Sequence, residues 1–182
     1  GSGQSSEKEE GLMIDAKDID LIAAQLERVP RGAIEVSSRC PSGHPNAVKT
    51  EPRLPDGTPF PTLFYLTCPR LTSAIGTLEA SGLMTDWSNE VAGDAALAAH
   101  YLAAHESYLA EREALGHVPE IDGISAGGMP TRVKCLHVLV GHSLAKGPGV
   151  NPFGDRAIEL LGDWWSGSTC AEGWVRPTEE PA

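Results

Sequence analysis

Three cysteines occupy places where this chain is expected to turn or to pass from one element to the next. Cys40 and Cys68 are each followed by proline, and Cys135 lies shortly after a glycine pair. Thiolates are preferred ligands of zinc and of iron–sulfur clusters. If the three side chains converge, we expect them to hold an iron–sulfur cluster, because no fourth protein ligand is obvious and Cys-Pro pairs recur at cluster sites. Zinc with His44 as fourth ligand is the alternative.

The same cysteines also fit a purely structural role. Free cysteine is among the most buried residue types, and the sequence has no C-x-x-C pair, which would be a stronger sign of a metal site. The fourth cysteine, Cys170, lies in a polar C-terminal stretch. Because the cysteines are widely spaced in a chain without secretory features, thiols or metal ligands are expected rather than disulfides.

A candidate anion site lies just before Cys135. The glycine pair at 127–128 and the proline at position 130 predict a helix over residues 130–146. Unpaired N–H groups and the positive end of the helix dipole favour an anion at such a start. Three side chains that add positive charge or can carry a proton follow in the first turns: Arg132, Lys134 and His137. We therefore expect an anionic small molecule to bind there.

Helix geometry restricts which residues can act together with Cys135. In a helix over residues 130–146, His142 would share a face with Cys135 but lie about 10.5 Å further along the axis. His137 would point about 200° away from Cys135. Neither histidine is then expected to share a metal ion with Cys135, and a base for a nucleophilic Cys135 would have to come from another element.

The stretch 51–61 is dense in proline and glycine, too irregular for a helix or a strand yet stiff. Such a loop would hold Arg53 and Asp56 in place, and we add both to the candidate binding residues. A plain surface connection is the alternative, and the usual role of loops favours it.

Periodicity predicts the elements that must position these residues. Alternating or aromatic stretches indicate strands at residues 33–38, 47–50 and 62–67. Helical spacing indicates further helices at residues 15–28, 71–83 and 92–115 and from position 151 onward. The strands are too few and too unevenly spaced for a series of βαβ units. We predict an α+β fold, in which a small antiparallel sheet of about three strands packs against a predominantly helical remainder.

Size and composition suit one folded domain, which we place at residues 15–165 of the 182. The polar ends, 1–14 and 166–182, are expected to be a disordered leader with a cloning remnant and a disordered tail. A net charge of −11 argues against general nucleic-acid binding. No apolar run approaches the roughly 20 residues of a membrane span and no signal peptide is visible, so the cytoplasm is the expected location. The sequence does not indicate an oligomeric state.

Four runs of the sequence stand out: RCP at 39–41, PRLPDGTPFPT at 52–62, YLTCP at 65–69 and GGMPTRVKCLH at 127–137. Together they resemble the domain of unknown function 501 family, which is found mainly in actinobacteria. The resemblance extends over about residues 19–161 and implies no known activity. It includes Cys40, Cys68 and Cys135 and leaves Cys170 out, which supports a site shared by the first three.

Three kinds of function stay open at this point. In the first, the three cysteines hold a metal or cluster, and the basic residues before His137 attract an anionic substrate. In the second, the protein is a non-catalytic interaction or regulatory protein whose cysteines are structural. In the third, Cys135 is the nucleophile of a metal-free thiol enzyme. Whether the chain is an enzyme is therefore undecided.

Overall fold

The computed structural model describes residues 14–28 and 30–165. The predicted leader and tail, residues 1–14 and 166–182, lie outside these ranges except for Ile14. That residue is buried against Ile22 and Val48, so it belongs to the folded domain and not to the leader.

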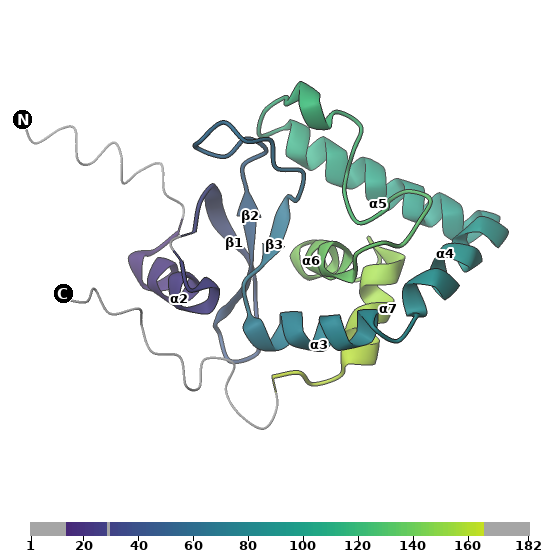
Figure 1. Cartoon of the computed structure of the whole chain (residues 1–182), viewed down its shortest axis with the longest axis horizontal. Helices are drawn as coiled ribbons and strands as arrows, with labels where there is room; N and C mark the ends of the chain where they lie inside the picture. Colours follow the sequence, from purple (N-terminus) through teal and green to yellow (C-terminus); the bar gives the residue numbers. More distant parts are fainter. Residues whose placement is uncertain (1–13, 29, 166–182) are drawn as a thin grey trace, which may run out of the picture.

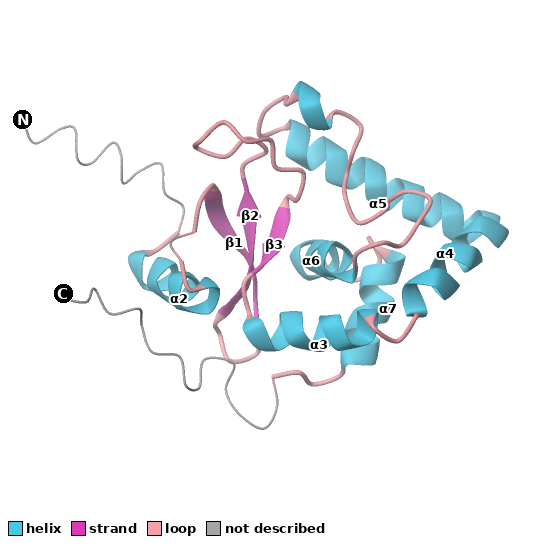
Figure 2. Cartoon of the chain, viewed as in Figure 1, coloured by secondary structure: helices cyan, strands magenta, loops and turns pink. Residues whose placement is uncertain are grey.

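The sheet has the predicted three antiparallel strands in the order β1-β2-β3 (Figure 2). They are β1 (Ala33–Arg39), β2 (Pro45–Thr50) and β3 (Phe64–Leu66). Val36 pairs with Val48, which in turn pairs with Tyr65. The turn between β1 and β2 is closed by the N–H of Cys40, which donates to the carbonyl of His44 at 2.9 Å. The α+β class is thus confirmed.

The two faces of the sheet pack against different helices. Figure 1 shows α2 (Ala16–Leu26) on one side of the sheet and α6 (Leu136–Lys146) on the other. Side chains alternate along a strand, so Val48 belongs to the small cluster under α2, whereas Ala47 belongs to the main core. Helix α6 approaches the sheet closely, because a Cβ on Gly141 would lie 2.8 Å from the carbonyl oxygen of Phe64.

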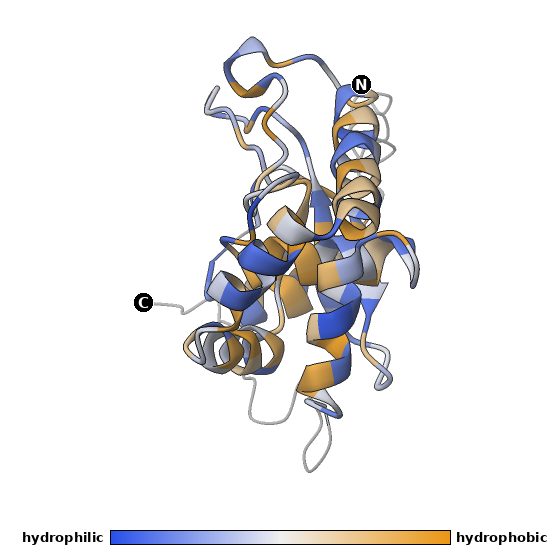
Figure 3. Ribbon diagram, turned by 90° about the vertical axis from the view of Figure 1, so that its right-hand side faces the viewer, coloured by the Kyte–Doolittle hydropathy of each residue, from blue (hydrophilic) through white to orange (hydrophobic). Residues whose placement is uncertain are grey.

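The remaining helices surround α6 and complete the main core. They are α3 (Pro69–Glu79), α4 (Leu83–Gly93), α5 (Ala95–Glu113), the short 3-10 helix η1 (Pro119–Ile121) and α7 (Pro152–Leu161). Phe153 lies at the centre of an aromatic group, with its ring 5.4 Å from that of Trp87 and 4.8 Å from that of Tyr101. Figure 3 shows that the helices carry both hydrophobic and hydrophilic residues, as expected of helices with one side on a core and one side in solvent.

The helix predicted over residues 130–146 begins only at Leu136, so its first part is wrong. Residues 126–135 form a folded loop with a cis bond between Met129 and Pro130. Contacts from distant elements hold this loop: Ser88 on α4 accepts the N–H of Val133 at 2.9 Å, and the hydroxyl of Tyr101 donates to the carbonyl of Arg132 at 2.9 Å. Tertiary contacts thus override a local helix signal.

A further difference from the prediction concerns α4. Helix α4 was not predicted, since the expected helices ended at position 83 and resumed at 92. Asp94 separates α4 from α5, and its side chain caps α5 by accepting the N–H of Leu97 at 3.1 Å.

Among the described residues, no helix has the length and apolar character needed to cross a membrane.

Candidate metal centre

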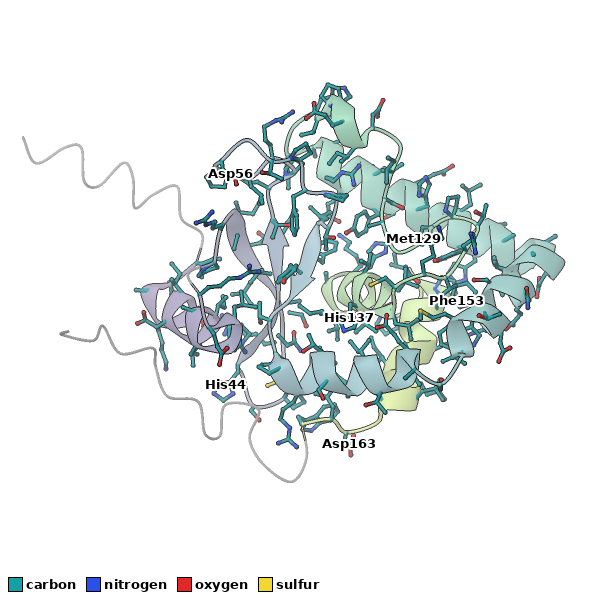
Figure 4. All side chains as sticks on the ribbon, in the orientation of Figure 1. His44, Asp56, Met129, His137, Phe153 and Asp163 are labelled. Atoms are coloured by element: carbon teal, nitrogen blue, oxygen red, sulfur yellow. The ribbon has the colours of Figure 1, made fainter. Side chains whose placement is uncertain are left out.

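Three side chains of different chemistry meet where α3 ends and α6 begins. Glu79 is the last residue of α3, Cys135 is the N-cap of α6, and His137 is the second residue of α6. One potential ligand atom of each lies within 4.8 Å of the other two. Figure 4 shows His137 on the side of α6 that faces α3. The exposed fraction of the side chain is 32% for His137 and 21% for Glu79, so the group is half-buried.

Glu79 and His137 each have a second contact that orients the side chain. The carboxylate of Glu79 accepts the N–H of Leu136 at 2.9 Å through Oε2, which leaves Oε1 to face Nδ1 of His137 at 3.2 Å. On the other side of the ring, Nε2 of His137 lies 3.2 Å from the carbonyl oxygen of Thr72. A carbonyl oxygen only accepts, so Nε2 carries the hydrogen and donates it. The atom Nδ1 is therefore the one that is turned toward Glu79.

The electrostatics of the group favour charged forms of Cys135 and His137. A hydrogen bond with Cys135 raises the pKa of His137 to about 9 against the effect of burial, and the charge of Glu79 adds to the rise. Burial acts to raise the pKa of the Cys135 thiol, but the hydrogen bond with His137 and the backbone amide of Val138 outweigh it and lower that pKa. Without a metal, the lowered pKa of Cys135 and the raised pKa of His137 both favour the charged forms of the pair.

The arrangement has the features of a metal site with an open position. A neutral His137 with its hydrogen on Nε2 would set two acceptors, Nδ1 and Oε1 of Glu79, against each other at 3.2 Å. A proton or a metal ion between them removes that repulsion. Thiolate, imidazole and carboxylate together match zinc, whose ligand atoms lie roughly 3.5 Å apart on a tetrahedral ion. Three protein ligands leave a fourth position for water or substrate.

The other two predicted ligands lie elsewhere in the fold. Cys40 and Cys68 are core residues with 4% and 0% exposure, and burial raises the pKa of Cys68. In the described part of the chain, neither joins Cys135 in a group of ligand atoms within 4.8 Å, nor does His44. Figure 4 shows His44 at the end of the sheet, away from His137. A cluster or zinc ion shared by the three cysteines therefore stays a prediction without structural support, and Cys170 lies outside the described residues.

In the described part of the chain, the helix start on which the predicted anion site was based is absent. No helix begins at Pro130, and the N–H of Leu136 at the true start is already bonded to Glu79. Arg132 and Lys134 are exposed, and neither forms an ion pair with another residue in ranges 14–28 and 30–165. Anion binding by these two cations stays a prediction.

Arg53 and Asp56 lie in the predicted loop between β2 and β3, and Figure 4 shows Asp56 on a different part of the molecule from His137. The guanidinium of Arg53 donates to the carbonyl of Gly57 at 2.8 Å and pairs with Glu120 at 2.8 Å. Asp56 accepts the N–H of Thr58 at 2.9 Å, and this bond lowers the pKa of its carboxyl group. Both side chains hold the loop in shape.

Sequence reasoning missed Glu79, and it named His137 as an anion-binding residue but excluded it as a metal ligand beside Cys135. Glu79 lies far from Cys135 in the sequence, and nothing near it signals a ligand. His137 was excluded because Cys135 was placed inside a helix, whereas the structure gives Cys135 an extended backbone with φ −149° and ψ 109°. The Cys-x-His spacing was the available signal, since an N-cap and the second helical residue can approach each other. A second convergent group, Glu113, His117 and Asp122, is fully exposed and is of a kind common without any ion.

Fold and site together define a small α+β protein with a half-buried candidate centre of three ligands. The chain belongs to the family described as protein of unknown function (DUF501), which matches residues 36–159 and so includes Glu79, Cys135 and His137. No curated protein and no solved structure matches the chain.

Proposed function

We propose that this chain is a metalloprotein that binds one zinc ion through Glu79, Cys135 and His137. The observation that carries the proposal is the position of Nδ1 of His137, 3.2 Å from Oε1 of Glu79, while Nε2 is bonded to the carbonyl of Thr72. A histidine that ligates a metal usually donates its other N–H to a carbonyl or a carboxylate in this way.

Charge and ligand type favour zinc over magnesium or calcium. The thiolate of Cys135 and the carboxylate of Glu79 together neutralise a divalent cation in a half-buried site. A soft thiolate selects zinc and related transition metals, whereas magnesium and calcium prefer oxygen ligands only. Cys135 needs to stay reduced for this role, so the proposal includes the cytoplasm, where thiols are kept reduced.

The fourth position of the zinc ion would be open to water or to a substrate atom. Bound zinc polarises an oxygen ligand or lowers the pKa of bound water. Arg132 and Lys134, exposed in the loop that leads to Cys135, would attract an anionic small molecule toward this position.

Metal analysis of the full chain tests the proposal directly. Protein that is purified without chelator and then dialysed is expected to contain one zinc ion per chain. Inductively coupled plasma mass spectrometry measures this zinc content. Replacement of zinc by cobalt is expected to give the absorption of a thiolate–cobalt bond in the near ultraviolet. Each of Cys135→Ser, His137→Gln and Glu79→Gln should reduce the zinc content toward zero.

Two sets of control variants separate this centre from its alternatives. His117→Gln removes the histidine of the exposed acidic group and should leave the zinc content unchanged. Cys40→Ala and Cys68→Ala should also keep zinc, provided that circular dichroism shows a folded chain. Loss of metal from all three cysteine variants, with retention in Glu79→Gln and His137→Gln, would replace this proposal by the three-cysteine centre.

A second candidate function rests on the pKa values of the same residues. The lowered pKa of Cys135 and the raised pKa of His137 describe a thiolate and imidazolium pair, as in enzymes with a cysteine nucleophile. Glu79 would then orient the imidazole. A chain that holds no metal but reacts with iodoacetamide at Cys135 well below pH 8 would favour this function over the zinc centre.

A further inference from the structure

A pocket lies on the opposite face of the sheet from α6. It has a volume of about 680 Å³ and is bounded by the end of α2, by the sheet and by the proline loop, residues 51–61. Its lining includes Val48 and Tyr65, which face α2 and not the main core. Pockets of this volume are of the size that binds small molecules. The pocket is separate from the candidate metal centre.

Its walls are apolar and partly aromatic. Leu26, Val48 and Leu54 line it, and the rings of Phe60 and Tyr65 stand 6.0 Å apart at an angle of 50°. Flat apolar groups pack well against such rings. The apolar cluster under α2 is only partly buried at this point, since Leu26 and Tyr65 remain half-exposed. A ligand in the pocket would complete the burial of that cluster.

Two arginines give the pocket a positive rim. Arg28 and Arg31 line it beside a single acidic residue, Asp56. Nη2 of Arg28 donates to the hydroxyl of Tyr65 at 3.2 Å, which places the guanidinium at the edge of the aromatic wall. Neither arginine forms a close ion pair within the described part of the chain, and the charge of Arg31 acts on the carboxylate of Asp56 from a greater distance. In a chain of net charge −11, this local excess of positive charge selects anions.

The wall that carries Phe60 is already folded. The N–H of Phe60 donates to the carbonyl of Pro52 at 2.8 Å, and the N–H of Leu54 donates to the carbonyl of Thr58 at 2.9 Å. The N–H of Glu51 donates to the carbonyl of Gly32 at 2.8 Å, which ties the loop to the start of β1. A preformed wall lowers the entropy lost when a ligand binds.

We propose that this pocket binds a small organic anion with a flat apolar body. The carboxylate or phosphate group of the ligand pairs with the guanidinium groups of Arg28 and Arg31, which suit planar, bidentate recognition. The apolar body lies against Phe60 and Tyr65.

Binding of defined probes to the full chain tests this proposal. The probes are 2-naphthoate and 1-naphthyl phosphate, with neutral 2-naphthylmethanol and inorganic phosphate as partial ligands. Amide chemical shifts in ¹H–¹⁵N spectra locate the binding site and report on folding in the same experiment. We expect both aromatic anions to shift amides of residues 31–33, 48–50 and 54–60, and each partial ligand to bind at least about tenfold more weakly.

Variants of exposed side chains complete the test without disturbing the core. Arg28→Gln and Arg31→Gln should each weaken binding of the aromatic anions about tenfold. Lys17→Gln, which removes one exposed positive charge from α2 outside the pocket, should leave the affinity unchanged. Equal affinity for the neutral probe, binding that is insensitive to both arginine variants, or no shift of these amides at millimolar probe would each overturn the proposal.

Discussion

Replacing His137 by glutamine in the metal-free chain should slow alkylation of Cys135 at neutral pH. Glutamine keeps a hydrogen-bonding side chain but removes the positive charge that favours the thiolate. A thiol with the ordinary pKa of 9.0 is about 1% ionised at pH 7, and only the thiolate reacts with iodoacetamide. In the wild-type chain, the lowered pKa of Cys135 increases the thiolate fraction at pH 7, so we expect a faster reaction.

The size of this effect follows from the pKa of His137. Its rise from 6.5 to about 9 corresponds to at most about 3.4 kcal/mol, at about 1.36 kcal/mol per pKa unit. Part of that energy comes from Glu79 and Thr72 and not from Cys135. Water also screens the half-exposed pair, so we discount the energy to less than half. What remains corresponds to an approximately tenfold lower alkylation rate in His137→Gln at pH 7.

Peptide-resolved mass spectrometry after timed exposure to iodoacetamide measures this rate between pH 5 and pH 10. The chain is first stripped of metal with a chelator, and His117→Gln serves as the control for loss of an exposed histidine. The wild-type rate should level off at a lower pH than the rate of His137→Gln. Identical rates and identical pH midpoints in the two chains would refute the ion pair of Cys135 and His137.

Three other predictions concern stability and are measured by urea unfolding. The raised pKa of His137 contributes stability that is complete below about pH 6.5 and is lost as the pH rises through about 9. The lowered pKa of Cys135 contributes stability that is complete above its ordinary pKa of 9.0 and is lost as the pH falls. The two changes oppose each other, so the metal-free wild type should change little in stability between pH 7 and pH 9.5, and a large loss in that range would contradict the coupling of the two residues. Gly141→Ala should lower the free energy of unfolding by about 1–3 kcal/mol, because a Cβ there would lie 2.8 Å from the carbonyl oxygen of Phe64. The control Gly76→Ala, in open space on α3, should leave that free energy unchanged or raise it. Equal effects of the two substitutions would contradict the close approach of α6 to the sheet. Arg112→Met should lower the free energy of unfolding by about 2–4 kcal/mol, because the buried guanidinium of Arg112 donates hydrogen bonds to the carbonyls of Pro61, Ile121 and Ile124. A change below about 0.5 kcal/mol would show that these hydrogen bonds contribute little to stability.

The sheet could be predicted because its signals are local. Alternation along β1 and β2, the aromatic run of β3 and the prolines around them lie within a few residues of the strands they define. The helix expected at Pro130 had equally clear local signals and was wrong. Bonds from Ser88 and Tyr101 hold residues 126–135 in another conformation, and no local pattern carries that information.

The candidate centre could be predicted only in part, for the same reason. Cys135 was singled out correctly as a residue at an element boundary, and His137 was noticed beside it. Their grouping depended on where α6 begins, and the wrong start turned His137 away from Cys135. Glu79 is brought to the centre by the packing of α3 against α6. Long-range packing of this kind cannot be inferred from spacing within one segment.

The bond between Glu79 and the N–H of Leu136 joins two points 57 residues apart in the chain. Helices α4 and α5 lie within the loop that this contact closes. A zinc ion held by Glu79 and Cys135 would therefore act as a cross-link, and by the chain-entropy estimate used for disulfides, closing a loop of this length is worth about 4 kcal/mol. Amides of α4 and α5 that do not contact the metal would then exchange their hydrogens more slowly in the zinc-loaded protein. Hydrogen exchange over about a third of the chain would therefore depend on whether the small centre is occupied.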